Sequence, residues 1–140
     1  MADNQCSACV ELKFPCKPEY VGVARLAILG VASRMRFSYL DVEDIRLAVG
    51  EACTTSVEWA KKNDRSDSDI VMRSEIGTDS LIVDIFDQAG ERKEENRADD
   101  PDQETENIGA LLITLLVDEV DVTSSNGGTH VRMVKHARQR

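Results

Sequence analysis

The chain has 140 residues, 41% of them hydrophobic and 31% charged, which predicts one globular domain large enough to bury a core. Its formal net charge of -9 at pH 7 argues against nucleic acid as a direct partner, because binding to phosphates requires a basic surface. No apolar segment as long as a membrane span is free of charged residues, so we expect no membrane partner and a cytoplasmic location.

The first half of the chain predicts one strand followed by two helices. Apolar and charged residues alternate in VELKF (10–14), which is the pattern of a half-buried strand. Pro18 suits the first turn of a helix, and the apolar pattern extends this helix to about Met35. Asp41 then opens a second helix with an acidic first turn, and this helix continues through IRLAVGEACTTSVEWAK (45–61).

The second half of the chain predicts two β-hairpins separated by a short apolar helix. Strands are expected at 70–76, 81–86, 120–123 and 129–135, with turns at GTDS (77–80) and NGG (126–128). The strand LIVDIF is apolar on both faces except at Asp84, so we expect it in the centre of the sheet. Asn107 is the expected N-cap of the helix at 108–117. This order of elements predicts an α+β fold, a two-layer sandwich in which helices cover one face of a mixed, mostly antiparallel sheet.

A long polar segment, DQAGERKEENRADDPDQETE (87–106), connects the first hairpin to the apolar helix. It holds nine acidic and three basic residues, a composition found both in disordered segments and in the lids of active sites. Its position between a central strand and a helix favours a lid at about 88–106. We therefore expect a single domain at 10–136, preceded by a flexible N-terminus (1–9) and followed by a short tail (137–140).

The second predicted helix carries a carboxylate, Glu51, in the middle of an otherwise apolar stretch. At about 100° per residue, small and aliphatic side chains form one broad face, and Glu51 lies just beyond its edge. Thr55 follows one turn later and projects beside Glu51. The pair forms either the solvated flank of an amphipathic helix, which helix statistics favour, or part of a pocket wall.

Four cysteines occur, at positions 6, 9, 16 and 53. Cys6 and Cys9 have the spacing of half a zinc knuckle, but no second pair with a matching spacing follows. This pattern favours reduced thiols over a metal-binding module built from Cys6, Cys9 and Cys16.

Four stretches of the chain together carry a family resemblance. They are PEYVGVARLAILGVASRM (18–35), DVEDIRLAVGEACT (41–54), the strand that ends in Asp87, and IGALLITLLVDEVDV (108–122) with the glycine-containing hairpin after it. In this order they closely resemble the anti-sigma factor serine kinases of the RsbW/SpoIIAB family, and the likeness covers residues 11–136. This family belongs to the GHKL group of ATP-binding folds, which also includes the catalytic domains of histidine kinases.

The resemblance implies an anti-sigma factor, which holds a sigma factor away from RNA polymerase and phosphorylates a serine of an anti-anti-sigma protein of the STAS type. ATP or ADP with Mg²⁺ is the implied ligand, and the bound nucleotide decides which partner is held. Members of this family dimerise through their first strand and first helix. VELKF (10–14) is therefore expected in the symmetric interface of a homodimer.

Three residues match functional positions of the family. Glu51 matches the catalytic glutamate, which activates the attacking hydroxyl, so a place on a pocket wall is expected for it. Asp87 matches the aspartate that accepts a hydrogen bond from the adenine amino group. Arg25 matches an arginine that contacts the sigma factor; without the resemblance, we would interpret it as an arginine that snorkels from an amphipathic helix.

Four positions depart from the family pattern around the phosphates and the metal. Thr55 stands where the family has a Mg²⁺-binding asparagine, and its hydroxyl is a weaker candidate ligand. The glycine after the adenine-binding aspartate comes one residue late, as Gly90. The last glycine box retains Gly109, with Asn107 two residues before it as a further candidate contact to nucleotide. Thr105 replaces a lid arginine.

These departures together predict that the fold and the partner switch are retained while the serine kinase activity is weakened or lost. One alternative is a fully active serine-protein kinase that phosphorylates the anti-anti-sigma factor. Another is an orphan histidine-kinase-type ATPase module, which is disfavoured because the chain has no phospho-accepting helix and only two histidines, His130 and His136.

Overall fold

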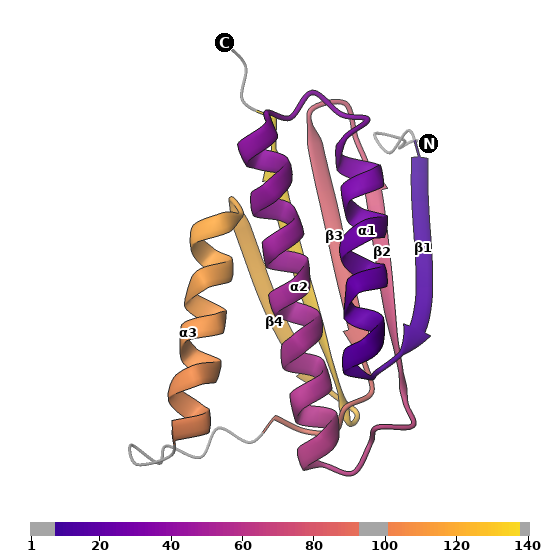
Figure 1. Ribbon diagram of the computed structural model, residues 1–140, viewed down its shortest axis with the longest axis vertical. Helices are drawn as coiled ribbons and strands as arrows, with labels where there is room; N and C mark the ends of the chain where they lie inside the picture. Colours follow the sequence, from indigo (N-terminus) through magenta and orange to yellow (C-terminus); the bar gives the residue numbers. More distant parts are fainter. Residues whose placement is uncertain (1–7, 93–100, 138–140) are drawn as a thin grey trace.

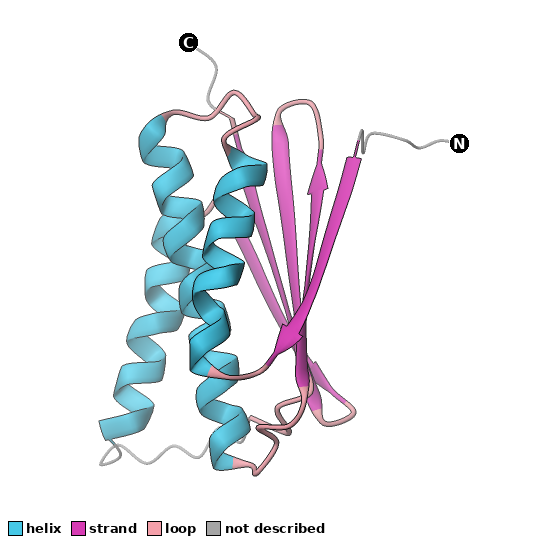
Figure 2. Cartoon of the chain, turned by 45° about the vertical axis from the view of Figure 1, so that its right-hand side comes forward, coloured by secondary structure: helices cyan, strands magenta, loops and turns pink. Residues whose placement is uncertain are grey.

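The computed structural model describes residues 8–92 and 101–137, and for residues 101–108 and Ser125 it describes the backbone alone. Within these residues the chain folds into two layers, in which three α-helices cover one face of a five-stranded sheet (Figure 1, Figure 2). The order of strands and helices predicted from the sequence is confirmed, and so is the α+β class. The elements are β1 (Ala8–Pro15), a short 3-10 helix η1 (Pro18–Tyr20), α1 (Val21–Ala32), α2 (Tyr39–Lys62), β2 (Asp69–Ile76), β3 (Ser80–Asp87), α3 (Pro101–Leu116), β4 (Glu119–Ser125) and β5 (Gly128–His136).

All neighbouring strands of the sheet are antiparallel, in the order β1-β2-β3-β5-β4. β3 therefore lies in the centre, as its sequence predicts. Its side chains on the helix side, Leu81, Val83 and Ile85, are buried. No described element covers the opposite face of the sheet (Figure 2), and Phe86 on that face is 38% exposed. The apolar pattern of β3 thus overestimates the burial of its second face.

Asp84 is the polar exception on the open face of β3, and residues of β5 shield it. Its Oδ1 lies 2.7 Å from Nε2 of His130 and 3.7 Å from a guanidinium nitrogen of Arg132. The His130 ring also stacks on Phe86, with ring centroids 4.2 Å apart. These contacts leave Asp84 only 4% exposed, and they satisfy the carboxylate that a central strand would otherwise bury without partners.

Two helices begin earlier than the sequence predicts. α2 begins two residues before Asp41 because Ser38 caps it: the Ser38 hydroxyl accepts a hydrogen bond from the Asp41 backbone N–H at 3.1 Å. α3 begins at Pro101, so the prediction of Asn107 as an N-cap is wrong, and residues 101–106 of the expected lid are helical. Proline suits the first helical position and acidic residues follow it, which favours this earlier start.

The core lies between the sheet and the inner faces of α1 and α2. The face of small and aliphatic residues predicted for α2 is buried there, including Ala48, Val49 and Ala52. Ile28 of α1 and Ile70 of β2 are fully buried in the same core. Burial of these apolar side chains is the main favourable contribution to folding. None of the helices in the described part of the chain is long and apolar enough to cross a membrane.

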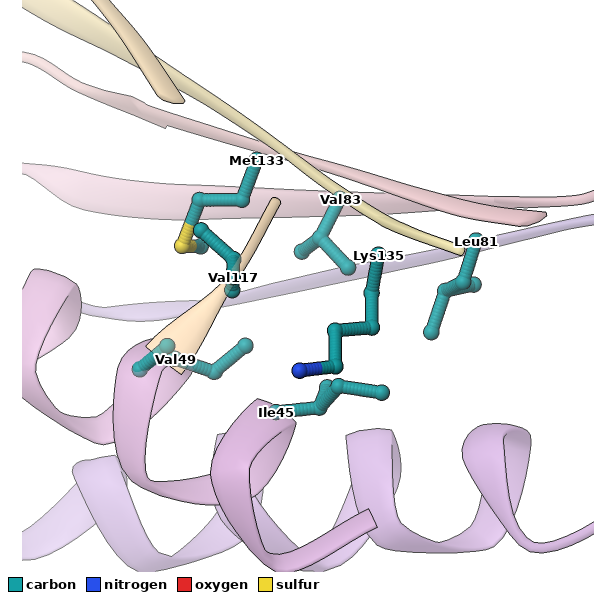
Figure 3. A pocket seen from close by; sticks show the side chains of 8 residues that line it. Ile45, Val49, Leu81, Val83, Val117, Met133 and Lys135 are labelled. Carbon is teal, nitrogen blue, oxygen red and sulfur yellow. The ribbon is translucent and has the colours of Figure 1, made fainter. Parts of the chain in front are cut away.

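A lysine, Lys135 of β5, is buried at the end of the core where α2 begins. It is 5% exposed, and its ammonium donates a hydrogen bond to the carbonyl of Leu116 at 2.8 Å. The ammonium also lies 3.7 Å from the Asp41 carboxylate and 3.8 Å from that of Asp44. Figure 3 shows it directed toward Ile45, among apolar side chains that line a cavity of about 10 Å³. Lys135 therefore joins the start of α2 to the end of α3.

We expect Lys135→Met to lower the free energy of unfolding by about 3 kcal/mol, because it leaves the buried Asp41 without its cation and the Leu116 carbonyl without a donor. Urea unfolding followed by circular dichroism measures this change. Lys13→Met is the matched control: its ammonium is exposed and lies 3.7 Å from Asp69, so little loss is expected. Equal effects of the two substitutions would contradict a structural role for Lys135.

Candidate functional site

The carboxylate of Asp87 lies at the end of β3, where it is 3% exposed and surrounded by hydrogen-bond donors. Its Oδ2 accepts hydrogen bonds from the Ser56 hydroxyl at 2.5 Å and from the Arg92 guanidinium at 3.0 Å. Its Oδ1 accepts hydrogen bonds from the backbone N–H groups of Ala89 and Thr129, at 3.1 and 3.2 Å. The residue predicted to recognise adenine is therefore a buried acceptor to which α2, β5 and the loop after β3 all contribute donors.

The loop after β3 folds back over the end of the strand, and Gly90 makes this path possible. Gly90 has a φ of 89°, a conformation that favours glycine, and its N–H donates to the carbonyl of Gly127 at 2.7 Å. The side-chain amide of Asn63 donates to the carbonyls of Ala89 and Glu91, at 2.8 and 3.1 Å. Gly90 comes one residue later than the glycine of the family pattern. It stands at the position where this loop requires a positive φ.

The β4–β5 hairpin also approaches the end of β3 closely. It turns through Asn126 and Gly127, which have φ values of 52° and 80°, as a tight turn between antiparallel strands requires. The next residue, Gly128, packs against the carbonyl of Asp87, and a Cβ at this position would collide with that oxygen. A glycine at position 128 therefore lets β5 deliver the Thr129 N–H to the Asp87 carboxylate.

Glu51 and Thr55 lie one turn apart on α2 and face α3. A Cβ built on Gly109 of α3 would lie 3.2 Å from Glu51 Oε2 and 4.0 Å from Thr55 Oγ1, so the missing side chain leaves room beside both. The Thr55 hydroxyl donates to the backbone carbonyl of Glu51 at 2.9 Å. Glu51 is thus half-buried where α2 contacts α3, and its expected place on a pocket wall stays a prediction.

Arg25 lies on the other side of α2, where α1 packs against it. Its guanidinium rests on Gly50: a Cβ at Gly50 would lie 2.9 Å from Arg25 Nη2. Among the described side chains no carboxylate forms an ion pair with Arg25. Elsewhere on its surface α1 exposes two apolar side chains, with Val23 44% and Leu26 71% exposed. Arg25 contacts α2 at Gly50, whereas Asp87 contacts α2 at Ser56.

The described residues offer little for a metal ion. No group of three or more His, Cys, Asp or Glu residues that could hold a metal occurs among them. Glu51 and Thr55 supply one carboxylate and one hydroxyl, so Mg²⁺ bound there would depend on water and on the phosphates of a nucleotide for its remaining ligands. The side chains of Thr105 and Asn107, and residues 93–100 of the predicted lid, lie outside the described residues.

The cysteines that the structure describes do not form a metal-binding cluster. Cys9 is exposed on β1, Cys16 and Cys53 are buried, and Cys6 lies outside the described residues. Burial raises the pKa of the Cys16 thiol to about 11 and the pKa of the Cys53 thiol to about 12. Both therefore stay protonated near neutral pH, and protonated thiols are poor metal ligands and poor nucleophiles.

Sequence reasoning missed four residues that hold Asp87 and its loop: Ser56, Asn63, Arg92 and Thr129. Ser56 could have been recognised as a candidate, because it is a polar residue on the apolar face of α2. Arg92 was a weaker candidate, as one of three bases in an acidic segment. Thr129 contributes its backbone N–H, which no side-chain pattern reveals.

Three comparisons with known proteins agree on the kind of domain. The family model described as a histidine kinase-like ATPase domain matches residues 14–135. The serine-protein kinase RsbW of Bacillus pumilus (strain SAFR-032) is 38% identical to this chain over 143 residues, covering 94% of the chain and 88% of that protein. RsbW of Bacillus subtilis (strain 168) is 36% identical over 137 residues, covering 91% and 84%.

Two solved structures share the fold. The crystal structure of the RsbU and RsbW domains of a Mycobacterium tuberculosis protein superimposes with a TM-score of 0.71 at 17% identity, covering 93% of this chain and 32% of that one. The histidine kinase domain of a blue-light activated histidine kinase from Erythrobacter litoralis gives a TM-score of 0.56 at 21% identity, covering 88% and 61%. At these identities the two structures support the fold alone.

We expect the two buried thiols to resist alkylation in the folded protein. In a Cys6→Ser/Cys9→Ser variant, a thiol reagent at about pH 8 should leave Cys16 and Cys53 unmodified, since burial keeps both protonated and inaccessible. Mass spectrometry counts the modified thiols, and unfolding in denaturant should make both react. Rapid modification of either thiol in native buffer would contradict the burial described here.

Proposed function

Because this chain belongs to the RsbW serine-protein kinases, within the histidine kinase-like ATPase domains, we propose that it is an anti-sigma factor of the partner-switching type. It holds a sigma factor away from RNA polymerase in the cytoplasm, and releases that factor when it binds an anti-anti-sigma protein of the STAS type. The observation that carries this proposal is the similarity to RsbW proteins over about nine tenths of the chain.

Nucleotide binding is the second part of the proposal, and the residues around Asp87 and Glu51 partly fit it. The buried Asp87 carboxylate would suit an adenine amino donor, and Gly109 has no side chain to fill the space beside Glu51 and Thr55. Glu51 is the residue proposed to orient the proton of an attacking hydroxyl. ATP would supply the phosphoryl group and leave as ADP, with Thr55 as the protein's weak contact to Mg²⁺.

We propose that the serine kinase activity is weakened, since Thr55 stands where the family has an amide ligand for Mg²⁺. The convergence of Glu51 and Thr55 beside Gly109 favours the alternative of a fully active serine-protein kinase. An orphan histidine-kinase-type ATPase is disfavoured, because the relatives named above are RsbW proteins.

The surface around Arg25 is the proposed docking site for the sigma factor. Arg25, a cation with no ion pair among the described side chains, lies on the same helix as the exposed Val23 and Leu26, so α1 supplies the charge and the apolar area that protein interfaces use. The edge strand β1 supports a homodimer. Among the described strands it pairs only with β2, so no described strand covers its outer edge, which a symmetric partner could use.

We expect Arg25→Glu to abolish capture of the cognate sigma factor in pull-down experiments, because the substitution reverses the charge at the position proposed to contact that factor. The circular dichroism spectrum should stay unchanged, since Arg25 makes no ion pair among the described side chains. Arg34→Glu, the same change at an exposed position after α1, should capture the factor like the unmodified protein. Unimpaired capture by Arg25→Glu would contradict the proposed surface.

We expect Thr55→Asn to strengthen Mg²⁺-dependent ATP binding by about tenfold, because an amide oxygen replaces a weak hydroxyl ligand. Titration calorimetry with ATP and ADP, each with Mg²⁺, measures this gain, and a phosphorylation assay with the anti-anti-sigma protein tests whether turnover follows. Thr54→Asn is the control, one residue away on the same helix. If Thr55→Asn gives no gain, the metal position does not limit binding.

A further inference from the structure

Arg92 occupies the acceptor that the proposed nucleotide base requires. Its side chain is 17% exposed, and one guanidinium nitrogen lies 3.0 Å from Asp87 Oδ2 and 3.4 Å from the Ser56 hydroxyl oxygen. The Nε of the same side chain is buried and has no hydrogen-bond partner among the described residues. The Arg92 guanidinium is therefore held by Asp87 while one of its own donors stays unsatisfied.

Hydrogen bonds to the loop backbone place Arg92 close to the Asp87 carboxylate. Asn63 holds the carbonyls of Ala89 and Glu91, and the N–H of Gly90 is bonded to the β4–β5 hairpin. These three hydrogen bonds fix the residues between Asp87 and Arg92, so the arginine reaches back to the carboxylate from an ordered loop. The contact is thus built into the path of the loop.

The Asp87 carboxylate has no acceptor capacity left for a further strong donor. An ionised carboxylate offers about four lone-pair positions, and four donors already approach this one. Two of them are backbone N–H groups fixed by the fold, and a third is the Ser56 hydroxyl inside the core. Arg92 is the donor that can leave by side-chain rotation alone, because its long side chain starts from the loop and is partly exposed.

We propose that Arg92 is an internal competitor for the base site: its guanidinium holds Asp87 Oδ2 when no nucleotide is bound, and an adenine amino group must displace it. This inference rests on the nucleotide binding proposed above and adds a residue that sets the affinity. Only molecules in which Arg92 has moved away can bind the base. The measured affinity therefore equals the intrinsic affinity multiplied by the fraction of such molecules. The ligand class is an adenine nucleoside or nucleotide.

The test compares the full chain with Arg92→Ala and Arg92→Gln in calorimetric titrations with adenosine and with ADP. Adenosine carries the base without phosphates, so it separates competition at Asp87 from attraction of phosphates by the arginine charge. We expect both ligands to bind both variants about tenfold more tightly than the unmodified protein. Arg92→Gln keeps much of the packing, so it provides the test if Arg92→Ala fails to fold.

Arg34→Ala is the charge-matched control, because Arg34 is exposed and lies between α1 and the start of α2, whereas Arg92 contacts Ser56 near the other end of α2. It should bind like the unmodified protein. Equal or weaker binding of adenosine by the Arg92 variants would overturn the inference, while ADP binding by the unmodified protein would preserve the nucleotide site. If neither ligand binds any of these proteins at millimolar concentration, the inference and the nucleotide site both fail.

Discussion

The hydrogen bonds around the buried carboxylate of Asp87 determine how the end of the sheet is built. A buried charge is costly unless donors surround it, and here the donors come from α2, from the loop after β3 and from β5. Gly90 and Gly128 are required because they let two of these segments come close enough. The group proposed to recognise the base is therefore also the group that fixes the walls around it, so changes to its neighbours probe recognition more cleanly than changes to Asp87 itself.

Local patterns predicted most of the fold, because strand alternation, helix periodicity and turn glycines act over a few residues. They predicted the element order, the central place of β3 and the position of Asp87 at its end. They failed where a partner is distant in sequence: Ser56 lies 31 residues from Asp87, and Asn63 lies 26 residues from the carbonyl that it holds. The wrong start of α3 has another cause, since the acidic composition that indicated a lid is also typical of a first helical turn after a proline.

α2 links the two proposed surfaces through consecutive residues. Gly50 lies under the Arg25 guanidinium on the side of α1, and Glu51 faces Gly109 on the side of α3. Both contacts depend on a glycine, so the helices approach α2 closely on either side. A helix with the proposed docking residue on one flank and the proposed nucleotide residue on the other would provide a short physical connection between partner binding and nucleotide binding.

The hydrogen bond from Lys135 to the carbonyl of Leu116 fastens α3 at its last residue. If α3 tilts, the end at Leu116 is therefore the end that stays fixed. At 1.5 Å per residue its 16 residues measure about 24 Å, so a tilt of about 10° moves the far end by about 4 Å and Gly109 by about 2 Å. Because Gly109 lies against Glu51 and Thr55, a small rotation about the Leu116 end changes the space beside both. A tilt of α3 about its contact with the buried lysine would therefore change the width of the site, even though Lys135 lies at the other end of β5 from the residue that pairs with Asp87.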